Sequence, residues 1–138
     1  MERPPLTVTS VVIGAREPRE LAAFYERLLG WQIVANEPAR PGFPPEDGWA
    51  MLRSPSDRGV MAIAVQWEPD YEPPVWPPRN GEPAMMLHLD IQADDGDVAN
   101  AVAWAVECGA TLAEHQPQDH TQVLFDPAGH PFCLFPNA

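Results

Sequence analysis

Basic residues are scarce in this sequence. Its 138 residues include 8 Lys and Arg against 20 Asp and Glu, which gives a formal net charge of −12 at pH 7. Nucleic acids and anionic membrane surfaces are bound through clusters of basic side chains, so we expect neither as a partner. The same charge permits the attraction of cationic ligands, although solubility alone also accounts for it.

Long hydrophobic runs are missing as well. No apolar segment approaches the roughly 20 residues that cross a bilayer, and Met1–Pro5 lacks the apolar core of a signal peptide. Only two cysteines are present, Cys108 and Cys133, and neither belongs to a CxxC pair. We therefore expect a cytoplasmic protein with reduced thiols rather than a disulfide framework or structural zinc.

Proline, by contrast, is abundant. The 18 prolines gather at the start of the chain, in 38–45 and in 69–83, where Trp, Tyr and Gly are interleaved. We interpret these stretches as stiff, ordered loops. The length of 138 residues and the hydrophobic content of 45% predict one domain, 1–138, with a core of its own.

The chain repeats one order of elements. In the first half the patterns predict strands over 6–14, 31–35, 49–52 and 60–67, with a helix between Pro18 and Gly30. In the second half they predict strands over 84–93, 110–114, 121–125 and 132–135, with a helix between the aspartates at 94, 95 and 97 and Gly109. The order βαβββ thus occurs twice. We predict module one at 6–67, a linker at 68–83 and module two at 84–136.

The segment 85–91 combines strand alternation with an unusual polar pair. Leucines and an isoleucine fall on one face, and Met86, His88 and Asp90 on the other. Because a buried charge is costly unless it is paired or used, we expect the polar face to line a cavity. There His88 and Asp90 would form a catalytic acid–base pair, or Asp90 would set the imidazole tautomer. A hydrogen-bonded pair at a sheet edge is the alternative.

Motifs from nearly the whole chain point to one family. They are Leu21-Ala22-Ala23-Phe24-Tyr25 with Leu29-Gly30-Trp31, then Asp70-Tyr71 through Trp76-Pro77, His88-Leu89-Asp90-Ile91, Gly109-Ala110, and Asp126-Pro127-Ala128-Gly129-His130-Pro131-Phe132-Cys133-Leu134. With them the chain resembles the vicinal oxygen chelate (VOC) superfamily of glyoxalase I, extradiol dioxygenases and bleomycin- and fosfomycin-resistance proteins, and more narrowly the bacterial glyoxalase-like proteins. The resemblance implies an α+β fold in which two βαβββ modules form a U-shaped cup of mixed β-sheet with the helices outside. It also suggests a homodimer.

The resemblance further implies four metal ligands, His or Gln and Glu, from the first and fourth strands of each module. The corresponding positions here are Ser10, Ala62 (or Gln66), His88 and Cys133. Only His88 matches, and a catalytic divalent ion needs about three protein ligands. We therefore expect no metal and no other cofactor, since His88 with Cys133 would hold at most a soft ion weakly.

Strand parity supplies the expected lining of the cup. Small residues opposite an aromatic and a few polar groups are typical of a small-molecule site, although a plain packed core is the alternative. Tryptophans at 49, 67 and 76 are expected as rim contacts, or as core and crossover residues. The predicted ligand-binding residues are Ser10, Val12, Trp49, Ala62, Ala64, Gln66, Trp67, Trp76, Cys133 and Phe135.

These observations predict a glyoxalase-like protein that binds a small organic ligand in the cup without the metal of the family. Two alternatives stay open. One is a metal-dependent lyase, isomerase or dioxygenase that uses His88. The other is a drug-binding resistance protein of the bleomycin-resistance type, to which the charge of −12 would attract a cationic compound. Whether the chain is an enzyme is left open by the sequence.

Overall fold

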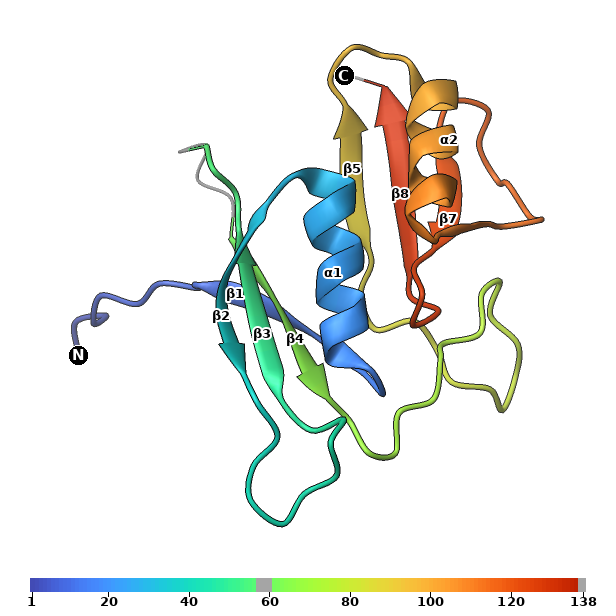
Figure 1. Cartoon of the computed structure of the whole chain (residues 1–138). Helices are drawn as coiled ribbons and strands as arrows, with labels where there is room; N and C mark the ends of the chain where they lie inside the picture. Colours follow the sequence, from blue (N-terminus) through green and yellow to red (C-terminus); the bar gives the residue numbers. More distant parts are fainter. Residues whose placement is uncertain (57–60, 137–138) are drawn as a thin grey trace. The chain divides into compact units, whose positions relative to one another are not determined.

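The computed structural model describes residues 1–56 and 61–136. The chain forms two compact units, which divide after Glu68. Among the described residues, each unit has the order βαβββ, with one helix and four strands (Figure 1). The predicted α+β class with two βαβββ modules is therefore confirmed. No helix in the described part of the chain is long and apolar enough to cross a membrane.

The first unit is a four-stranded mixed sheet with one helix. Its elements are β1 (Ser10–Ala15), α1 (Pro18–Leu29), β2 (Gln32–Glu37), β3 (Trp49–Arg53) and β4 (Ala62–Trp67). The strands lie in the order β1-β4-β3-β2, with β1 and β4 parallel and the other neighbours antiparallel.

Local sequence explains the limits of α1. Pro18 stands in the first turn, where its missing N–H costs nothing. Gly30 ends the helix with a φ of 67°, a left-handed conformation that glycine adopts without strain. Between them Leu21, Phe24 and Tyr25 are buried, at the i, i+3 and i+4 spacing of one helix face, and the two aromatic rings meet edge to face at 4.9 Å.

The second unit repeats the arrangement. Its elements are β5 (Leu89–Ala93), α2 (Val98–Cys108), β6 (Thr111–Leu112), β7 (Gln122–Phe125) and β8 (Pro131–Pro136). The strand order β5-β8-β7-β6 matches that of the first unit, again with the first and last strands parallel. Asp97 caps α2 by accepting a hydrogen bond from the Asn100 amide at 3.0 Å, as the acidic residues predicted. Leu124 and Phe132 are fully buried and form the core.

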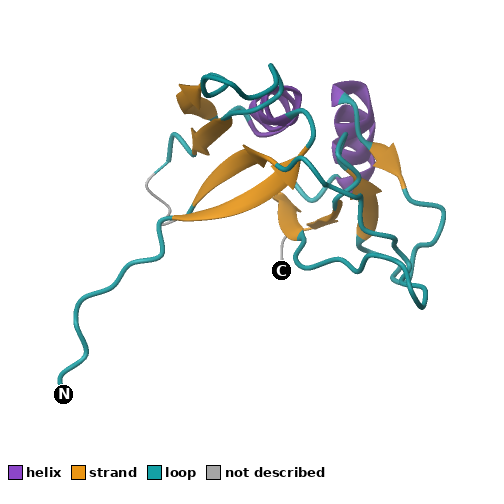
Figure 2. Ribbon diagram, turned by 90° about the horizontal axis from the view of Figure 1, so that it is seen from below, coloured by secondary structure: helices purple, strands orange, loops and turns teal. Residues whose placement is uncertain are grey.

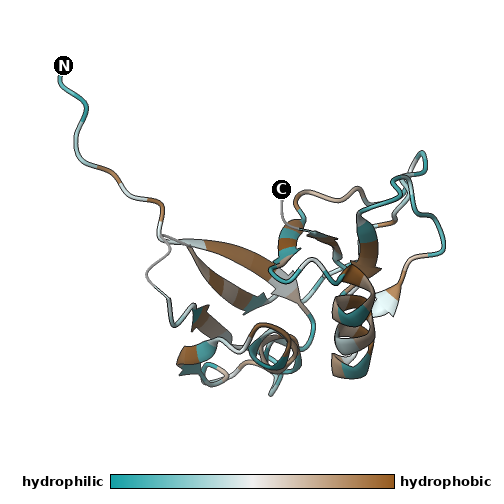
Figure 3. Cartoon of the chain, turned by 90° about the horizontal axis from the view of Figure 1, so that it is seen from above, coloured by the Kyte–Doolittle hydropathy of each residue, from teal (hydrophilic) through white to brown (hydrophobic). Residues whose placement is uncertain are grey.

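Two strands, β1 and β5, begin four and five residues later than predicted. The strand expected from residue 6 begins at Ser10, and residues 1–9 form a loop (Figure 2). This loop is mixed in hydropathy (Figure 3), and it leaves the side chains of Leu6 and Val8 exposed. The strand expected from residue 84 begins at Leu89, so His88 immediately precedes β5. Of the strand predicted over 60–67, residue 60 lies outside the described residues.

Candidate functional site

The second unit contains a pocket of about 410 Å³. One part of its lining is apolar and consists of Trp76, Met85, Val123 and Phe135, together with two prolines. The other part is polar and consists of His88, Asp90, Gln118, Thr121 and Cys133. Five of these residues were predicted from the sequence: His88, Asp90, Trp76, Cys133 and Phe135. An apolar wall facing a few polar groups is the usual composition of a small-molecule site.

His88 and Asp90 are in contact, as the alternation predicted. The imidazole Nε2 lies 3.2 Å from Asp90 Oδ1. Their side chains are not buried, however, since they are 41% and 63% exposed. The alternation identified the shared face correctly, but the face opens to solvent as well as to the pocket. The catalytic role of the pair stays a prediction.

Cys133 joins the pair through the register of the sheet. In the parallel ladder of β5 and β8 it stands beside Asp90. Burial raises the pKa of the Cys133 thiol, and the negative charge and hydrogen bond of Asp90 raise it further. At neutral pH the thiol is therefore protonated, which makes it a weak nucleophile.

The aromatic wall of the pocket is held by contacts along the linker. The Trp76 ring lies 5.6 Å from His115 and 6.3 Å from Phe125, between ring centroids. Upstream of it, the Tyr71 hydroxyl donates a hydrogen bond to the carbonyl of Ala128 at 2.6 Å. The crossover therefore joins the modules and places the Trp76 indole in the pocket lining. A role of Trp76 in ligand binding stays a prediction.

A single glutamine shapes the loop that carries Gln118. The Gln116 side chain donates to the carbonyls of Ala113 and Val123, both at 2.9 Å, and accepts from the Val123 amide at 2.8 Å. The Gln116 side chain thus bonds both backbone groups of Val123 on β7, as the backbone of a neighbouring strand would. Sequence reasoning missed Gln118 and Thr121, although their place in a short polar loop before a strand was a usable signal.

Three predicted residues line a pocket in the first unit instead. This pocket has a volume of about 430 Å³, and Trp49, Gln66 and Trp67 belong to its lining. The other four predicted residues, Ser10, Val12, Ala62 and Ala64, share one sheet face, because Ser10 pairs with Ala62 and Val12 with Ala64. They are not among the residues that line either pocket. Their assignment to ligand binding stays a prediction.

The donors present do not form the ligand set that the resemblance implies. Ala62 has no donor atom, and the Gln66 amide is hydrogen-bonded to Glu68. In the second unit, two of the implied positions, His88 and Cys133, form a cluster with Asp90, and the donor atoms of the three lie within 4.8 Å of one another. Nitrogen, oxygen and sulfur together suit Zn²⁺ or a softer ion better than Mg²⁺ or Mn²⁺.

Comparisons with known proteins agree with this architecture. Residues 10–135 match the family described as the glyoxalase-like domain. No curated protein sequence matches the chain significantly. A solved glyoxalase/bleomycin resistance protein/dioxygenase family enzyme from Burkholderia phytofirmans PsJN is similar, with a TM-score of 0.64 and 18% identity over 93% of this chain and 96% of that one.

Two further solved structures are similar at lower identity. One is the fosfomycin resistance protein FosX from Listeria monocytogenes complexed with Mn(II), with a TM-score of 0.69 and 10% identity over 96% of this chain and 93% of that one. The other is a glyoxylase/bleomycin resistance protein/dioxygenase domain from Frankia sp. EAN1pec, with a TM-score of 0.64 and 14% identity over 98% and 100% of the two chains. At such identities the likeness establishes the fold. The family match over nearly the whole length shows that this chain belongs to the glyoxalase-like domain family.

Proposed function

We propose that the chain binds a small organic molecule in the pocket of its second unit, without a metal ion. The observation that carries this proposal is the pocket itself, in which an apolar wall around Trp76 and Phe135 faces the polar group of His88, Asp90 and Cys133. Apolar walls supply most of the affinity for such ligands, and a few polar groups orient them.

The charges of the lining narrow the class of ligand. Among the described residues, the lining of this pocket includes neither Lys nor Arg. A phosphonate such as the dihydroxypropylphosphonic acid bound to a Listeria FosX would lack a cationic partner here. The proposed ligand is therefore neutral or cationic.

The His88–Asp90 pair gives the pocket one group that can exchange protons. Because Nε2 lies 3.2 Å from the Asp90 carboxylate, it would carry the proton of the neutral ring, which leaves Nδ1 as the basic nitrogen. A ligand with an acidic C–H or O–H beside Nδ1 would have a base in position. The proposed chemistry is proton transfer on the bound molecule, and binding alone is the simpler outcome.

A thermal-shift screen in the presence of EDTA tests this function. Neutral and cationic metabolites and antibiotics are screened, and hits are titrated against His88→Ala and Phe135→Leu. His120→Ala is the matched control, because His120 is exposed and outside the pocket lining. We expect the pocket variants to lose affinity and the control to retain it. Hits that bind both pocket variants as tightly as the wild type would overturn the proposal, as would a screen without hits.

One observation favours a second candidate, a metal-dependent lyase, isomerase or dioxygenase. It is the cluster of His88, Asp90 and Cys133, whose donor atoms lie within 4.8 Å of one another. Around a zinc-like ion, bonds of about 2.0–2.3 Å place donors roughly 3.5 Å apart. The donors would have to approach by about 1 Å, which the exposed His88 and Asp90 side chains allow by rotamer changes. A bound ion would supply a Lewis acid for a carbonyl or oxygen substrate.

Metal titration separates the two candidates. With Co²⁺ as the probe, a thiolate-to-metal charge-transfer band that disappears in Cys133→Ser would support the metal-dependent candidate. Stoichiometric metal in the protein purified without chelator would support it further. Absence of the band, with ligand binding that is unaffected by EDTA, is what the leading proposal requires.

A homodimer and a cytoplasmic location are also proposals. Among the described residues Cys108 and Cys133 form no disulfide bond, as expected in a reducing compartment. Light scattering coupled to size exclusion tests the dimer, with an expected mass of twice that of the chain. Fractionation of native cells tests the location.

A further inference from the structure

The second pocket, in the first unit, contains a row of three paired residues on β2, β3 and β4. Glu37 on β2 pairs with Trp49 on β3, and Trp49 pairs with Gln66 on β4. Gln66 in turn stands beside Gly14 on β1. Directly paired residues of neighbouring strands lie on the same face of a sheet. A carboxylate, an indole and an amide therefore stand side by side at one end of this sheet.

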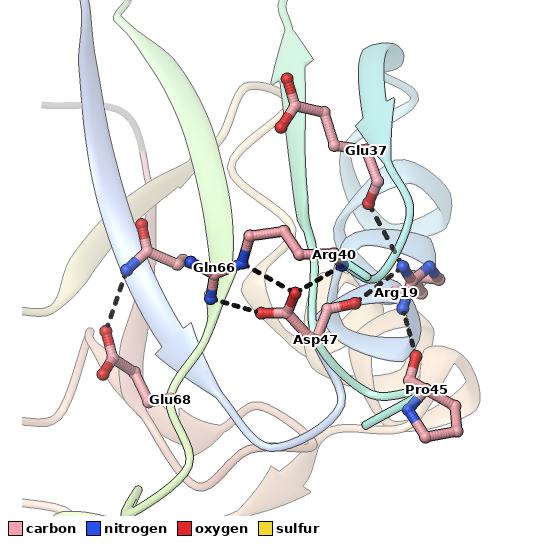
Figure 4. A network of polar contacts seen from close by, with 7 residues as sticks. All are labelled: Arg19, Glu37, Arg40, Pro45, Asp47, Gln66 and Glu68. Atoms are coloured by element: carbon pink, nitrogen blue, oxygen red, sulfur yellow. Dashed lines mark hydrogen bonds and ion pairs between the residues drawn. The ribbon is translucent and has the colours of Figure 1, made fainter. Parts of the chain in front are cut away.

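A second carboxylate, that of Glu68, lies at the β1 end of the row, beside Gln66 and over Gly14. The Gln66 amide donates a hydrogen bond to Glu68 Oε1 at 3.2 Å (Figure 4). The Glu68 side chain passes directly over Gly14, because a Cβ at that position would lie 2.7 Å from Glu68 Cγ. Gly14 thus leaves the space that this carboxylate needs. The row carries a negative charge at each end, Glu37 on β2 and Glu68 beside β1.

The wall of this pocket is a loop that is already held in shape. Within the segment 38–48, Arg40 forms two side-chain hydrogen bonds to Asp47, at 2.8 and 3.0 Å, and its own amide donates a third at 2.8 Å. From α1, Arg19 donates to the carbonyls of Pro45, Glu37 and Asp47 at 2.9–3.2 Å (Figure 4). Five hydrogen bonds from arginine side chains therefore preorganise the loop.

The loop adds little net positive charge to the pocket. The Arg40 guanidinium is balanced by Asp47, which is only 2% exposed. Arg40 Cζ lies over the Phe43 ring, 3.9 Å from the ring centroid. The Phe43 ring meets the Trp67 ring edge to face, with 6.4 Å between centroids. The charge that remains in the lining is that of Glu37, in a chain of net charge −12. Glu68, beside Gln66, and Arg19, on the backbone carbonyls of the loop, lie outside the lining.

We propose that this pocket is a second binding site, for a small organic cation with an apolar body such as a quaternary ammonium compound. Its volume of about 430 Å³ suits a small ligand. The indoles of Trp49 and Trp67 offer aromatic faces, which attract cations through the ring quadrupole. Glu37 in the lining adds direct charge attraction, and Glu68 adds to it from its place beside Gln66. None of the residues lining this pocket belongs to the pocket of the proposed function, so the two proposals stand separately.

Choline and its neutral isostere 3,3-dimethylbutan-1-ol form a matched pair of probes. NMR titration of the full chain, with the indole N–H signals assigned, reports where each one binds. We expect choline to shift the signals of Trp49 and Trp67 saturably, and the uncharged probe to bind about tenfold more weakly or not at all. Equal affinity for the two probes, or no shift with either, would overturn the proposal.

Variants then locate the site. Trp49→Leu and the exposed Glu37→Gln are each expected to weaken choline binding several-fold, and Glu37→Gln also to reduce its dependence on salt. Trp104→Leu and Glu82→Gln are the controls, since both residues are exposed and outside the pocket lining. Trp49→Phe, which retains an aromatic face, should recover part of the binding. His88→Ala should leave choline binding unchanged. Choline binding that survives both Trp49→Leu and Glu37→Gln would refute this site.

Discussion

Gly48 stands where the loop 38–48 returns to β3, and it has no room for a side chain. Its φ of +142° is one that other residues rarely adopt, and a Cβ would lie 2.6 Å from the carbonyl oxygen of Glu37 and 2.5 Å from Arg19 Nη2. The carbonyl belongs to a paired strand and cannot move away alone. Gly48→Ala therefore combines a backbone cost of about 1–2 kcal/mol with an overpacking cost of about 1–3 kcal/mol. We expect a loss of about 2–5 kcal/mol in the free energy of unfolding.

Gly42→Ala is the matched control, in the same loop. Gly42 also has a positive φ, +83°, but a Cβ there meets nothing within 4 Å. It should lose only the backbone contribution, about 1 kcal/mol. The effect of alanine on the unfolded chain is common to both variants and cancels in their difference. Urea unfolding followed by tryptophan fluorescence measures both, and equal losses in the two variants would refute the steric argument.

Three further predictions concern other contacts. Hydrogen bonds from Arg40 lower the pKa of Asp47 from 3.8 to about 2. The ionised carboxylate therefore stabilises the folded protein at neutral pH, and this stabilisation is lost as the pH falls from about 4 through 2. The difference in urea midpoint between wild type and Asp47→Asn should shrink over that interval, and a constant difference would contradict this assignment. Tyr71→Phe removes the donor to the Ala128 carbonyl and should cost about 1 kcal/mol by urea unfolding, whereas an unchanged midpoint would show that the contact contributes nothing. Gln116→Ala leaves the Val123 amide without its acceptor and should lower the free energy of unfolding by about 1–3 kcal/mol, with faster hydrogen exchange at that amide. Exchange at the wild-type rate would show that the Gln116 side chain does not protect the amide.

Several features of this protein follow from the sequence alone. The limits of α1 follow from Pro18 and Gly30, because a pyrrolidine ring and a left-handed glycine act on the backbone locally. The doubled βαβββ order follows from periodicity, which is set by the geometry of helices and strands. The shared face of His88 and Asp90 follows in the same way. Such features need no knowledge of what lies across the fold.

Other features are decided only by the tertiary structure. Alternation places His88 and Asp90 on one face, but it does not say what covers that face, and both side chains are exposed. Cys133 stands beside Asp90 because of the register between β5 and β8, which are far apart in the chain. Likewise, Arg19 reaches the Asp47 carbonyl across 28 residues. Each of these contacts depends on how distant segments pair and pack, and local backbone preferences do not encode that pairing.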